Sequence, residues 1–370
     1  MGEVFRAIHI DRGFPVAFKI MNADRARDPD MRAALRREIR AVARLHHPGI
    51  VMVFDCGEVP SEIEHDSRGR FVTGSSWFAM ELATYSLEDL DRNDLDWWQV
   101  RNIFVRILDA LAHSHARGVI HRDLKPGNVL FVEGSDGRHL KLTDFGLAHA
   151  LDVRPDDQPR NDGLTDKITG TPRFMSPEQI TGRWRDHGPW TDLYALGCLA
   201  YWLIDGDPPY RGDDADRIMQ SHLDEPLPPL HASFDLPPGF GAWLGRLLAK
   251  RPGERFQRAA DAARALFALG DPPGQRRSDE HQRLEFHAPL DRGLDADTPD
   301  TDMGMTEIIS DVIAAPSVPD LQSLQQSGRP PAASFDGRDS VEIPASWRRS
   351  EPPPMSTDLI GVGLGLFGLR

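Results

Sequence analysis

Three polar side chains at the two ends of a short apolar stretch have the chemistry of a reactive site. Asp123 lies in the segment HRDLKPGN, which ends at Asn128, and Asp144 opens the triplet DFG. The residues between them alternate in a way that predicts a β-hairpin with the polar groups at its ends. One carboxylate can orient a hydroxyl group and accept its proton, whereas an amide and a second carboxylate are oxygen ligands suited to Mg²⁺. These residues predict a phosphoryl-transfer site; the simpler alternative is a polar loop with two surface aspartates.

The order of these residues resembles the catalytic signatures of the protein kinase family. The pattern HRDL-x-x-x-N followed by DFG is matched in full. The chain is similar to the bacterial, eukaryotic-like Ser/Thr type, in which Lys125 would reach the γ-phosphate of ATP. By this resemblance Asp123 is the catalytic base, and Asn128 and Asp144 hold Mg²⁺. The implied reaction transfers the γ-phosphoryl group of ATP to Ser or Thr hydroxyls of protein substrates.

Bulk composition agrees with one kinase-sized unit followed by a tail. The chain has 370 residues, 40% of them hydrophobic, and its net charge is −14. Such an acidic balance argues against nucleic acid as the main partner, because phosphate backbones require basic surfaces. Cys56 and Cys198 are too few for a disulfide framework, so we expect a reducing, cytoplasmic setting. No apolar run is long enough for a membrane segment, and the first residues do not read as a signal peptide.

Lysine usage provides a second line of evidence within the sequence. Lysine occurs only five times, and arginine fills the remaining 38 of the 43 basic positions. Two of the five, Lys19 and Lys125, occupy positions where the kinase pattern requires lysine. Arginine and lysine are not equivalent at a compact phosphate contact. The exceptions to the arginine bias therefore favour a nucleotide site.

The elements before the hairpin would position the phosphate-binding residues. Residues 3–20 predict two strands joined by a turn, and the second contains VAFK, ending at Lys19. It resembles the kinase strand whose lysine holds the α- and β-phosphates. Residues 29–45 predict a helix, since a proline follows the N-cap candidate Asp28. By resemblance Glu38 on this helix pairs with Lys19; an ordinary surface glutamate among arginines is the alternative.

The adenine site is expected between the two lobes. Strands are predicted at residues 51–55 and 77–82, separated by a polar and mobile loop at residues 60–75. The segment MELA resembles the hinge of a kinase, with Met80 as the gatekeeper. The resemblance assigns Glu81 and Ala83 to the hinge, and Val4, Ala17 and Leu130 to the two faces of the base.

A long helix is predicted immediately before the catalytic segment. Residues 97–117 carry apolar side chains at helical spacing. His113 and His115 near its end are expected to face solvent or to cap the helix rather than to bind a metal. His121 is interpreted as a structural residue that packs beneath the DFG triplet.

By resemblance, residues 149–175 form the activation loop. A phosphate on Thr165 or Thr169 would pair with Arg122 and order this loop. We therefore expect one of these threonines to be phosphorylated, and mass spectrometry that finds neither modified in active protein would contradict this. Thr171 instead matches the threonine that braces the catalytic loop.

Three further residues are implied to support the site rather than to react. The segment after the loop reads Ser-Pro-Glu where the family has Ala-Pro-Glu, and its Glu178 is implied to pair with Arg255. Asp192 opens a predicted helix and is implied to accept hydrogen bonds from the catalytic-loop backbone. Residues 193–270 predict amphipathic helices with proline-rich connections.

The fold class expected from the resemblance is α+β, the two-lobed protein kinase fold. The predicted small lobe covers residues 1–83 and the mainly helical large lobe residues 84–270, while residues 271–370 read as a disordered Pro/Ser/Asp-rich tail. Of the glycine-rich loop only Gly2 remains, so the small lobe is expected to lack its first strand. The apolar C-terminal residues resemble the entrance to a further domain.

Two alternative functions remain open from the sequence. The first is a pseudokinase, a nucleotide-binding or scaffold module without catalysis, which the incomplete glycine-rich loop would favour. The second is an ATP-dependent small-molecule phosphotransferase. Retention of Lys19, Asp123, Asn128 and Asp144 argues against the first. Lys125 and the GTPRFMSPE segment, which forms a peptide-binding ledge in protein kinases, argue against the second.

Overall fold

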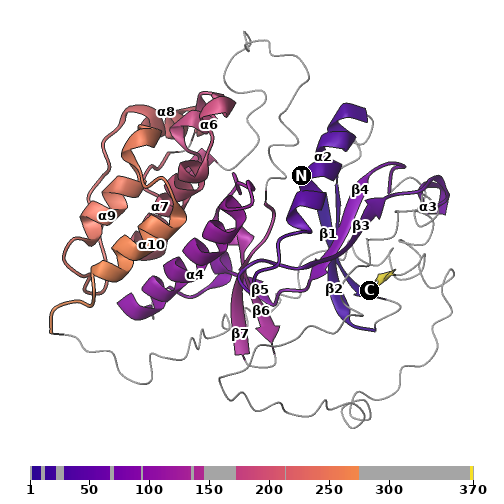
Figure 1. Cartoon of the computed structure of the whole chain (residues 1–370), viewed down its shortest axis with the longest axis horizontal. Helices are drawn as coiled ribbons and strands as arrows, with labels where there is room; N and C mark the ends of the chain where they lie inside the picture. The colour runs from indigo at the N-terminus through magenta and orange to yellow at the C-terminus, as the bar shows by residue number, and fades with distance from the viewer. Residues whose placement is uncertain are drawn as a thin grey trace, which may run out of the picture.

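A strand-rich lobe and a helical lobe lie side by side in the computed structural model of the chain (Figure 1). None of the helices in the described part is long and apolar enough to cross a membrane. The described residues are 2–9, 13–21, 29–66, 71–92, 95–134, 137–145, 172–212, 214–274 and 367–369.

The strand-rich lobe is built on an antiparallel five-stranded sheet in the order β3-β4-β2-β1-β8. Its register places Val4 opposite Lys19 and Ala17 opposite Met80. The ATP-site candidates of neighbouring strands therefore lie next to each other. The strands are β1 (Gly2–His9), β2 (Pro15–Met21), β3 (Val53–Glu58), β4 (Ser76–Glu81) and β8 (Phe367–Leu369).

Strand alternation gives this sheet two apolar faces. Ala17 and Met21 of β2 pack with Leu35 and Ile39 of the helix α2 (Pro29–Val42). The intervening residues of β2 face the other side, where Phe18 stacks on Trp77 with ring centroids 5.3 Å apart. Because successive side chains of a strand point to opposite faces, one buried strand serves both clusters. Helix α2 is thereby fixed against the face that carries Lys19.

Two segments of the small lobe differ from the sequence-based expectation. Residues 60–75 were predicted to be a mobile loop, but Ser61–Asp66 form the helix α3. Its Ile63 packs against the outer apolar cluster of the sheet, a contact that the polar composition of the segment did not predict.

In the tail predicted to lack structure, β8 pairs with β1, with Leu369 opposite Ala7. The sheet edge expected to be empty is therefore occupied by a distant part of the chain.

The helical lobe surrounds one large apolar core. Helix α4 (Trp97–His115) begins with a capping box, in which the Asp96 carboxylate accepts a hydrogen bond from the Gln99 main chain at 2.9 Å. Its buried Phe104 and Leu108 belong to the same core as Leu199 of α7 (Pro189–Asp205). The remaining helices are α6 (Pro177–Ile180), α8 (Ala215–Asp224), α9 (Phe240–Leu247) and α10 (Ala259–Ala268). Short 3₁₀ turns cover Leu87–Asp89, Pro126–Asn128, Pro172–Phe174, Trp184–Asp186 and Pro252–Glu254.

The predicted hairpin is present and lies between the lobes. It consists of β6 (Val129–Gly134) and β7 (Gly137–Leu142), with β5 (Tyr85–Ser86) on the other side of β6. The register pairs Val129 with Leu142, so the residue before β6 and the residues after β7 meet at one end of the hairpin. This geometry is what brings Asn128 towards Asp144.

Candidate active site

The catalytic-loop side chains contact one another directly. Lys125 Nζ donates to Asp123 Oδ2 at 2.8 Å, and Asn128 Nδ2 donates to the same oxygen at 3.1 Å. Asn128 Nδ2 also donates to the Asp123 main-chain carbonyl at 2.7 Å. The turn Pro126–Asn128 folds the segment back and thereby aligns the three groups. The side-chain nitrogen of Asn128 donates within the loop. Its side-chain oxygen is therefore left for a ligand.

Asp192 at the start of α7 holds the backbone of this loop. Its carboxylate accepts from the main chain of His121 at 2.8 Å and of Arg122 at 2.7 Å. Burial alone would raise the pKa of Asp192, but the hydrogen bond and charge of His115 outweigh it and lower the pKa. Arg122 has φ +64°, a backbone conformation that costs free energy outside glycine. Asp192 on one side and Gln179 Nε2, which donates to the Arg122 carbonyl at 2.8 Å, hold it there.

His115 contradicts the expectation that it faces solvent or caps the helix. Its ring Nε2 lies 2.7 Å from the buried Asp192 carboxylate, and the His115 side chain is itself only 7% exposed. The sequence alone predicts an exposed histidine at this helix end, because the carboxylate that contacts it lies 77 residues later in the chain. The missed signal is the apolar face of α4, on which His115 lies one turn after Leu111.

The residue that opens the DFG triplet faces Lys19 across the cleft. Lys19 Nζ donates to Asp144 Oδ2 at 2.6 Å, and Asp144 has φ +61°. The other oxygen, Asp144 Oδ1, is buried and has no hydrogen-bond partner among the described residues. Below it, His121 is fully buried with its ring 4.5 Å from that of Phe145. Burial lowers the pKa of His121, which favours the neutral ring, and its Nδ1 accepts a hydrogen bond from the Asp123 main chain at 3.3 Å.

Asn128 and Asp144 fit the donor set of a magnesium site. The main-chain N–H of Thr143 donates to the main-chain carbonyl of Asn128 at 3.1 Å. This hydrogen bond joins the segment before β6 to the segment after β7. The unpartnered Asp144 Oδ1 is the kind of hard oxygen that Mg²⁺ requires. Within the part of the chain that the structure describes, no three His, Cys, Asp or Glu side chains are grouped to hold a metal. Mg²⁺ usually takes one or two protein ligands together with phosphates and water, which these two residues can provide.

Glu38 does not pair with Lys19, contrary to the sequence-based expectation. Its Oε1 lies 3.6 Å from Arg122 Nη1, while Lys19 is engaged by Asp144. The long side chain of Arg122 extends from the catalytic loop to Glu38 on α2. Burial raises the pKa of Glu38, and the charges of Arg122 and Arg37 oppose that rise. The sequence located both residues at the site but gave the wrong partner for each.

The expected adenine-site residues gather on the inner face of the small lobe. Ala17 and Met80 are buried in one apolar cluster, against which Leu130 packs. Val4 lies beside them in the sheet register and is 55% exposed. The main-chain amide of Glu81 bonds the carbonyl of Met52 at 3.0 Å, and Ala83 follows in the connection to the helical lobe. The structure thus places Ala17, Met80 and Leu130 in one cluster, with Val4 on the neighbouring strand, and their role at the adenine stays a prediction.

A model of one protein family, described as the protein kinase domain, matches residues 1–261. The chain belongs to the protein kinase family. A probable serine/threonine-protein kinase of Corynebacterium efficiens is 36% identical over 277 residues, which cover 73% of this chain and 39% of that protein. Serine/threonine-protein kinase PknA of Mycobacterium tuberculosis is 34% identical over 281 residues, covering 74% and 60%. The chain therefore spans less than two thirds of the length of these relatives.

The fold agrees with this family. The crystal structure of the Mycobacterium tuberculosis PknI kinase domain matches with a TM-score of 0.51 and 29% sequence identity. The match covers 73% of this chain and 92% of the PknI domain. The two-lobed kinase fold expected from the sequence is confirmed.

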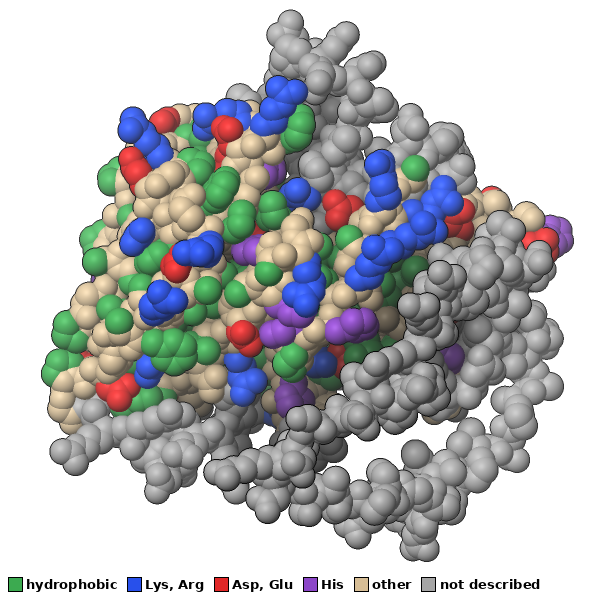
Figure 2. All heavy atoms as spheres, viewed as in Figure 1, with side chains coloured by type: hydrophobic (Ala, Val, Ile, Leu, Met, Phe, Trp, Pro, Cys, Tyr) green, Lys and Arg blue, Asp and Glu red, His purple; other side chains and the backbone are tan. Residues whose placement is uncertain are grey.

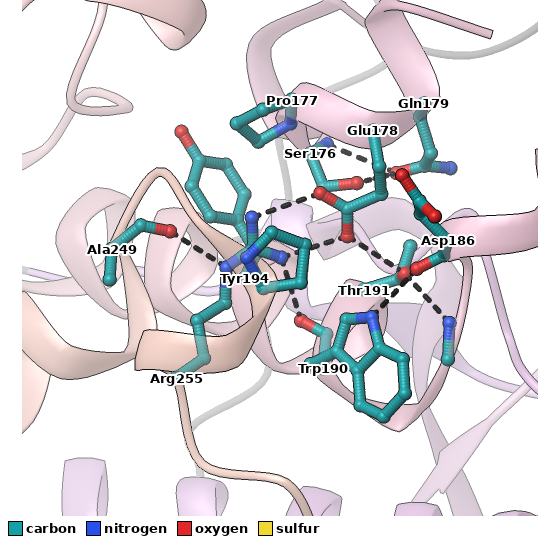
Figure 3. A network of polar contacts seen from close by, with 12 residues as sticks. Ser176, Pro177, Glu178, Gln179, Asp186, Trp190, Thr191, Tyr194, Ala249 and Arg255 are labelled. Atoms are coloured by element: carbon teal, nitrogen blue, oxygen red, sulfur yellow. Dashed lines mark hydrogen bonds and ion pairs between the residues drawn. The ribbon is translucent and has the colours of Figure 1, made fainter. Parts of the chain in front are cut away.

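A buried ion pair supports the large lobe of this kinase domain (Figure 3). Arg255 donates to both oxygens of the Glu178 carboxylate, at 2.8 and 2.9 Å, and both side chains are fully buried. Thr191 donates to the same carboxylate at 2.9 Å, and Arg255 also donates to the Trp190 carbonyl. Burial would raise the pKa of Glu178, but the hydrogen bonds and charge of Arg255 lower it. The network joins α6, α7 and the segment before α10.

Every lysine in the described part of the kinase domain has a specific acceptor. Lys19 and Lys125 donate to the carboxylates described above, and Lys141 donates to both oxygens of Glu81 at 2.6 and 2.8 Å. Lys250 donates to the Tyr210 hydroxyl at 2.8 Å and to two main-chain carbonyls at 2.7 and 3.0 Å. Sequence reasoning explained only the first two. The rarity of lysine would have marked Lys141 and Lys250 as well.

Lys141 joins the hairpin to Glu81 at the end of β4, so its loss should destabilise the kinase domain. The Glu81 carboxylate that it binds also accepts from the Met52 main chain at 2.8 Å and is only 19% exposed. We expect Lys141→Met to lower the free energy of unfolding by about 1–3 kcal/mol, the cost of leaving a shielded carboxylate unpaired. Urea denaturation would measure it.

An exposed pair of the large lobe provides the control. The side chains of Arg251 and Glu254 are 84% and 59% exposed, so Arg251→Met should cost about 0–1 kcal/mol, as is usual for a surface pair. Equal losses from the two variants would show that Lys141 has no special role.

Three candidates of the activation loop, Thr165, Thr169 and Thr171, lie outside the described residues, as does Gly146. Their roles stay predictions.

Proposed function

We propose that this chain is a Mg²⁺- and ATP-dependent Ser/Thr protein kinase, which phosphorylates hydroxyl groups of protein substrates. The observation that carries the proposal is the convergence of five side chains at the end of one hairpin. Lys125 and Asn128 donate to Asp123, and Lys19 lies 2.6 Å from Asp144. No observation on the described residues favours a non-catalytic module, since none of these groups is replaced or displaced from the cleft.

Each residue has a chemical task in this proposal. The ammonium of Lys19 is a compact charge that suits the α- and β-phosphates of ATP. Asn128 and Asp144 would hold Mg²⁺, which neutralises the charge that develops on the transferred phosphoryl group. Asp123 orients the attacking hydroxyl and takes its proton, and Lys125 bridges towards the γ-phosphate. Catalysis then consists mainly of positioning and charge stabilisation.

The lobe assignments follow from the same proposal. We place the nucleotide between a small lobe of residues 1–83 and a large lobe of residues 84–270, with the hinge at residues 80–83. Ala17, Val4 and Leu130 would contact the faces of the base. Residues 271–370 stay a predicted tail apart from β8. A cytoplasmic location remains an expectation based on the two unpaired cysteines.

Autophosphorylation tests the proposal directly. The parent chain is incubated with radiolabelled ATP and Mg²⁺ beside Asp123→Asn and Asp144→Asn, and with a basic protein as a general substrate. We expect incorporation by the parent alone, and its loss when Mg²⁺ is chelated. Incorporation by all three proteins would indicate a contaminating kinase. Absence of incorporation from the parent on both acceptors would contradict the proposal.

A further inference from the structure

Arginine side chains gather on the exposed side of α2, in a chain that is acidic as a whole. Residues 32–44 contain five arginines and one glutamate, so their charge is +4, whereas the complete chain has a net charge of −14. Arg36, Arg37 and Arg40 are exposed on α2, and Arg44 is exposed in the turn that follows it. Figure 2 shows Lys and Arg side chains next to one another over this helix. We call these four residues the arginine patch.

Neighbouring acidic groups neutralise the arginine patch only in part. Arg36 Nε lies 3.2 Å from the carboxylate of Glu58 on β3, and the Arg36 side chain is still 46% exposed. Arg40 and Arg44 have no carboxylate partner among the described residues. Like charges four residues apart on a helix repel each other and destabilise it. An anionic partner that binds the patch would offset this repulsion.

The spacing of these arginines fits the carboxylates of an extended segment. Arg36 and Arg40 are four residues apart, a distance of about 6 Å along a helix axis. In an extended segment, side chains that point to the same side recur every second residue, at about 6.6 Å. A segment with an acidic residue at every second position would therefore present one carboxylate to each of Arg36, Arg40 and Arg44. Guanidinium groups bind carboxylates through paired, charge-assisted hydrogen bonds.

A membrane surface and a nucleic acid fit the arginine patch less well. A helix that lies in a membrane surface must insert its apolar face, but the apolar face of α2, with Leu35 and Ile39, is buried against the sheet. Single-stranded nucleic acids are usually bound with aromatic side chains that stack on the bases. The exposed large apolar side chains of the described residues include no aromatic from α2 or β3. The acidic remainder of the chain would also repel a long polyanion.

We propose that the arginine patch is a docking surface for an extended acidic segment of a partner protein, with carboxylates at every second position. The patch lies on the exposed side of α2, whereas the buried side of the helix faces the sheet. The bound segment would hold its protein against the small lobe. Binding requires neither nucleotide nor phosphoryl transfer, so the proposal goes beyond the proposed kinase function.

Fluorescence anisotropy of a labelled peptide in which Glu and Ser alternate tests the docking surface without ATP. We expect saturable binding by the parent chain that weakens as the salt concentration rises, because salt screens exposed charges. The triple variant Arg36→Gln/Arg40→Gln/Arg44→Gln should bind the peptide about tenfold more weakly, the combined effect of three exposed ion pairs.

A second triple variant provides the matched control. Arg183→Gln/Arg217→Gln/Arg251→Gln changes the net charge by the same amount, at side chains of the large lobe that are 60%, 62% and 84% exposed. It should bind the peptide as the parent does. Equal weakening in the two triple variants would show that only the overall charge matters and would overturn the proposal.

The thiol of Cys56 gives a readout that needs no substitution. Cys56 is exposed on β3, two residues before Glu58 and therefore on the same face of the strand, while the other cysteine, Cys198, is fully buried. Partial burial raises the pKa of the Cys56 thiol, as does the charge of Asp55, and the charge of Arg40 opposes that rise. Cys56 thus lies beside the arginine patch. Its alkylation by iodoacetamide should slow as the peptide is added.

Absence of peptide binding by the parent would overturn the docking surface, as would binding of phosphatidylserine vesicles or of an oligonucleotide in place of the peptide. If circular dichroism shows the first triple variant to be unfolded, the alkylation rate of Cys56 in the parent decides, and an unchanged rate at saturating peptide would contradict the proposal. The result is independent of the autophosphorylation assay. A chain that binds the peptide but incorporates no phosphate would retain the docking surface and contradict the proposed kinase function.

Discussion

Replacing Arg255 with methionine should lower the free energy of unfolding by about 3–5 kcal/mol, the usual effect of breaking a buried ion pair. Glu178 would remain fully buried, keep the hydrogen bond from Thr191, and lose both donors of the guanidinium group. Urea denaturation at pH 7, followed by circular dichroism, measures the change. A loss below about 1 kcal/mol, the range of an exposed pair, would contradict it.

The pH dependence of this variant separates a lost charge partner from lost packing. In the parent the pKa of Glu178 lies below its ordinary value of 4.5, so its contribution to stability is present above that pH and is lost as pH falls through the lowered pKa. Without Arg255, burial raises the pKa of Glu178 instead. The deficit of Arg255→Met should therefore be largest at neutral pH and shrink as Glu178 takes up a proton. The double variant Glu178→Leu/Arg255→Met should recover most of the stability.

Replacing Lys19 with methionine should reduce autophosphorylation by about 10²–10³-fold, the usual effect of removing one group that stabilises transition-state charge. The Nζ of Lys19, 2.6 Å from Asp144, is the small-lobe cation closest to the proposed metal ligand. Initial rates of phosphate incorporation at saturating ATP provide the measurement. The melting temperature of the variant should be recorded beside them to show that it is folded.

Lys19→Arg tests whether charge alone is sufficient. The side chain of Lys19 is 10% exposed, and a planar guanidinium is not equivalent to its compact ammonium at a buried phosphate contact. We expect this variant to lose most of the activity although it keeps the charge. Full activity of Lys19→Arg would show that arginine serves equally well and would remove the argument from lysine usage.

Local patterns predicted the hairpin and the residues at its ends. The alternation around Val129 and Leu142 depends only on neighbouring residues, and it fixes where Asn128 and Asp144 lie. The same applies to α4, whose apolar spacing is continuous and whose capping box lies within four residues. The residue types of the candidate site were therefore accessible from the sequence, together with their approximate arrangement.

The sequence could not predict which side chains pair where the pairing depends on the relative position of two elements. Glu38 contacts Arg122 and not the predicted Lys19, a choice that depends on the position of α2 against the large lobe. His115 reads as a surface residue until α7 brings Asp192 against it. Helix α3 forms in a polar segment because Ile63 has an apolar cluster to bury against. In each case a tertiary contact overrides what the local residues indicate.

The engagement of the four described lysines gives this protein a further experimental property. Acylating reagents attack only the free, deprotonated amine, whereas each of these ammonium groups donates to a nearby acceptor. Modification at a given lysine therefore requires the local contact to open first. The rate of labelling at Lys141 would report separation of the hinge from the hairpin. The rate of labelling at Lys250 would report opening of the large lobe. Amine acylation can therefore follow two parts of the molecule separately.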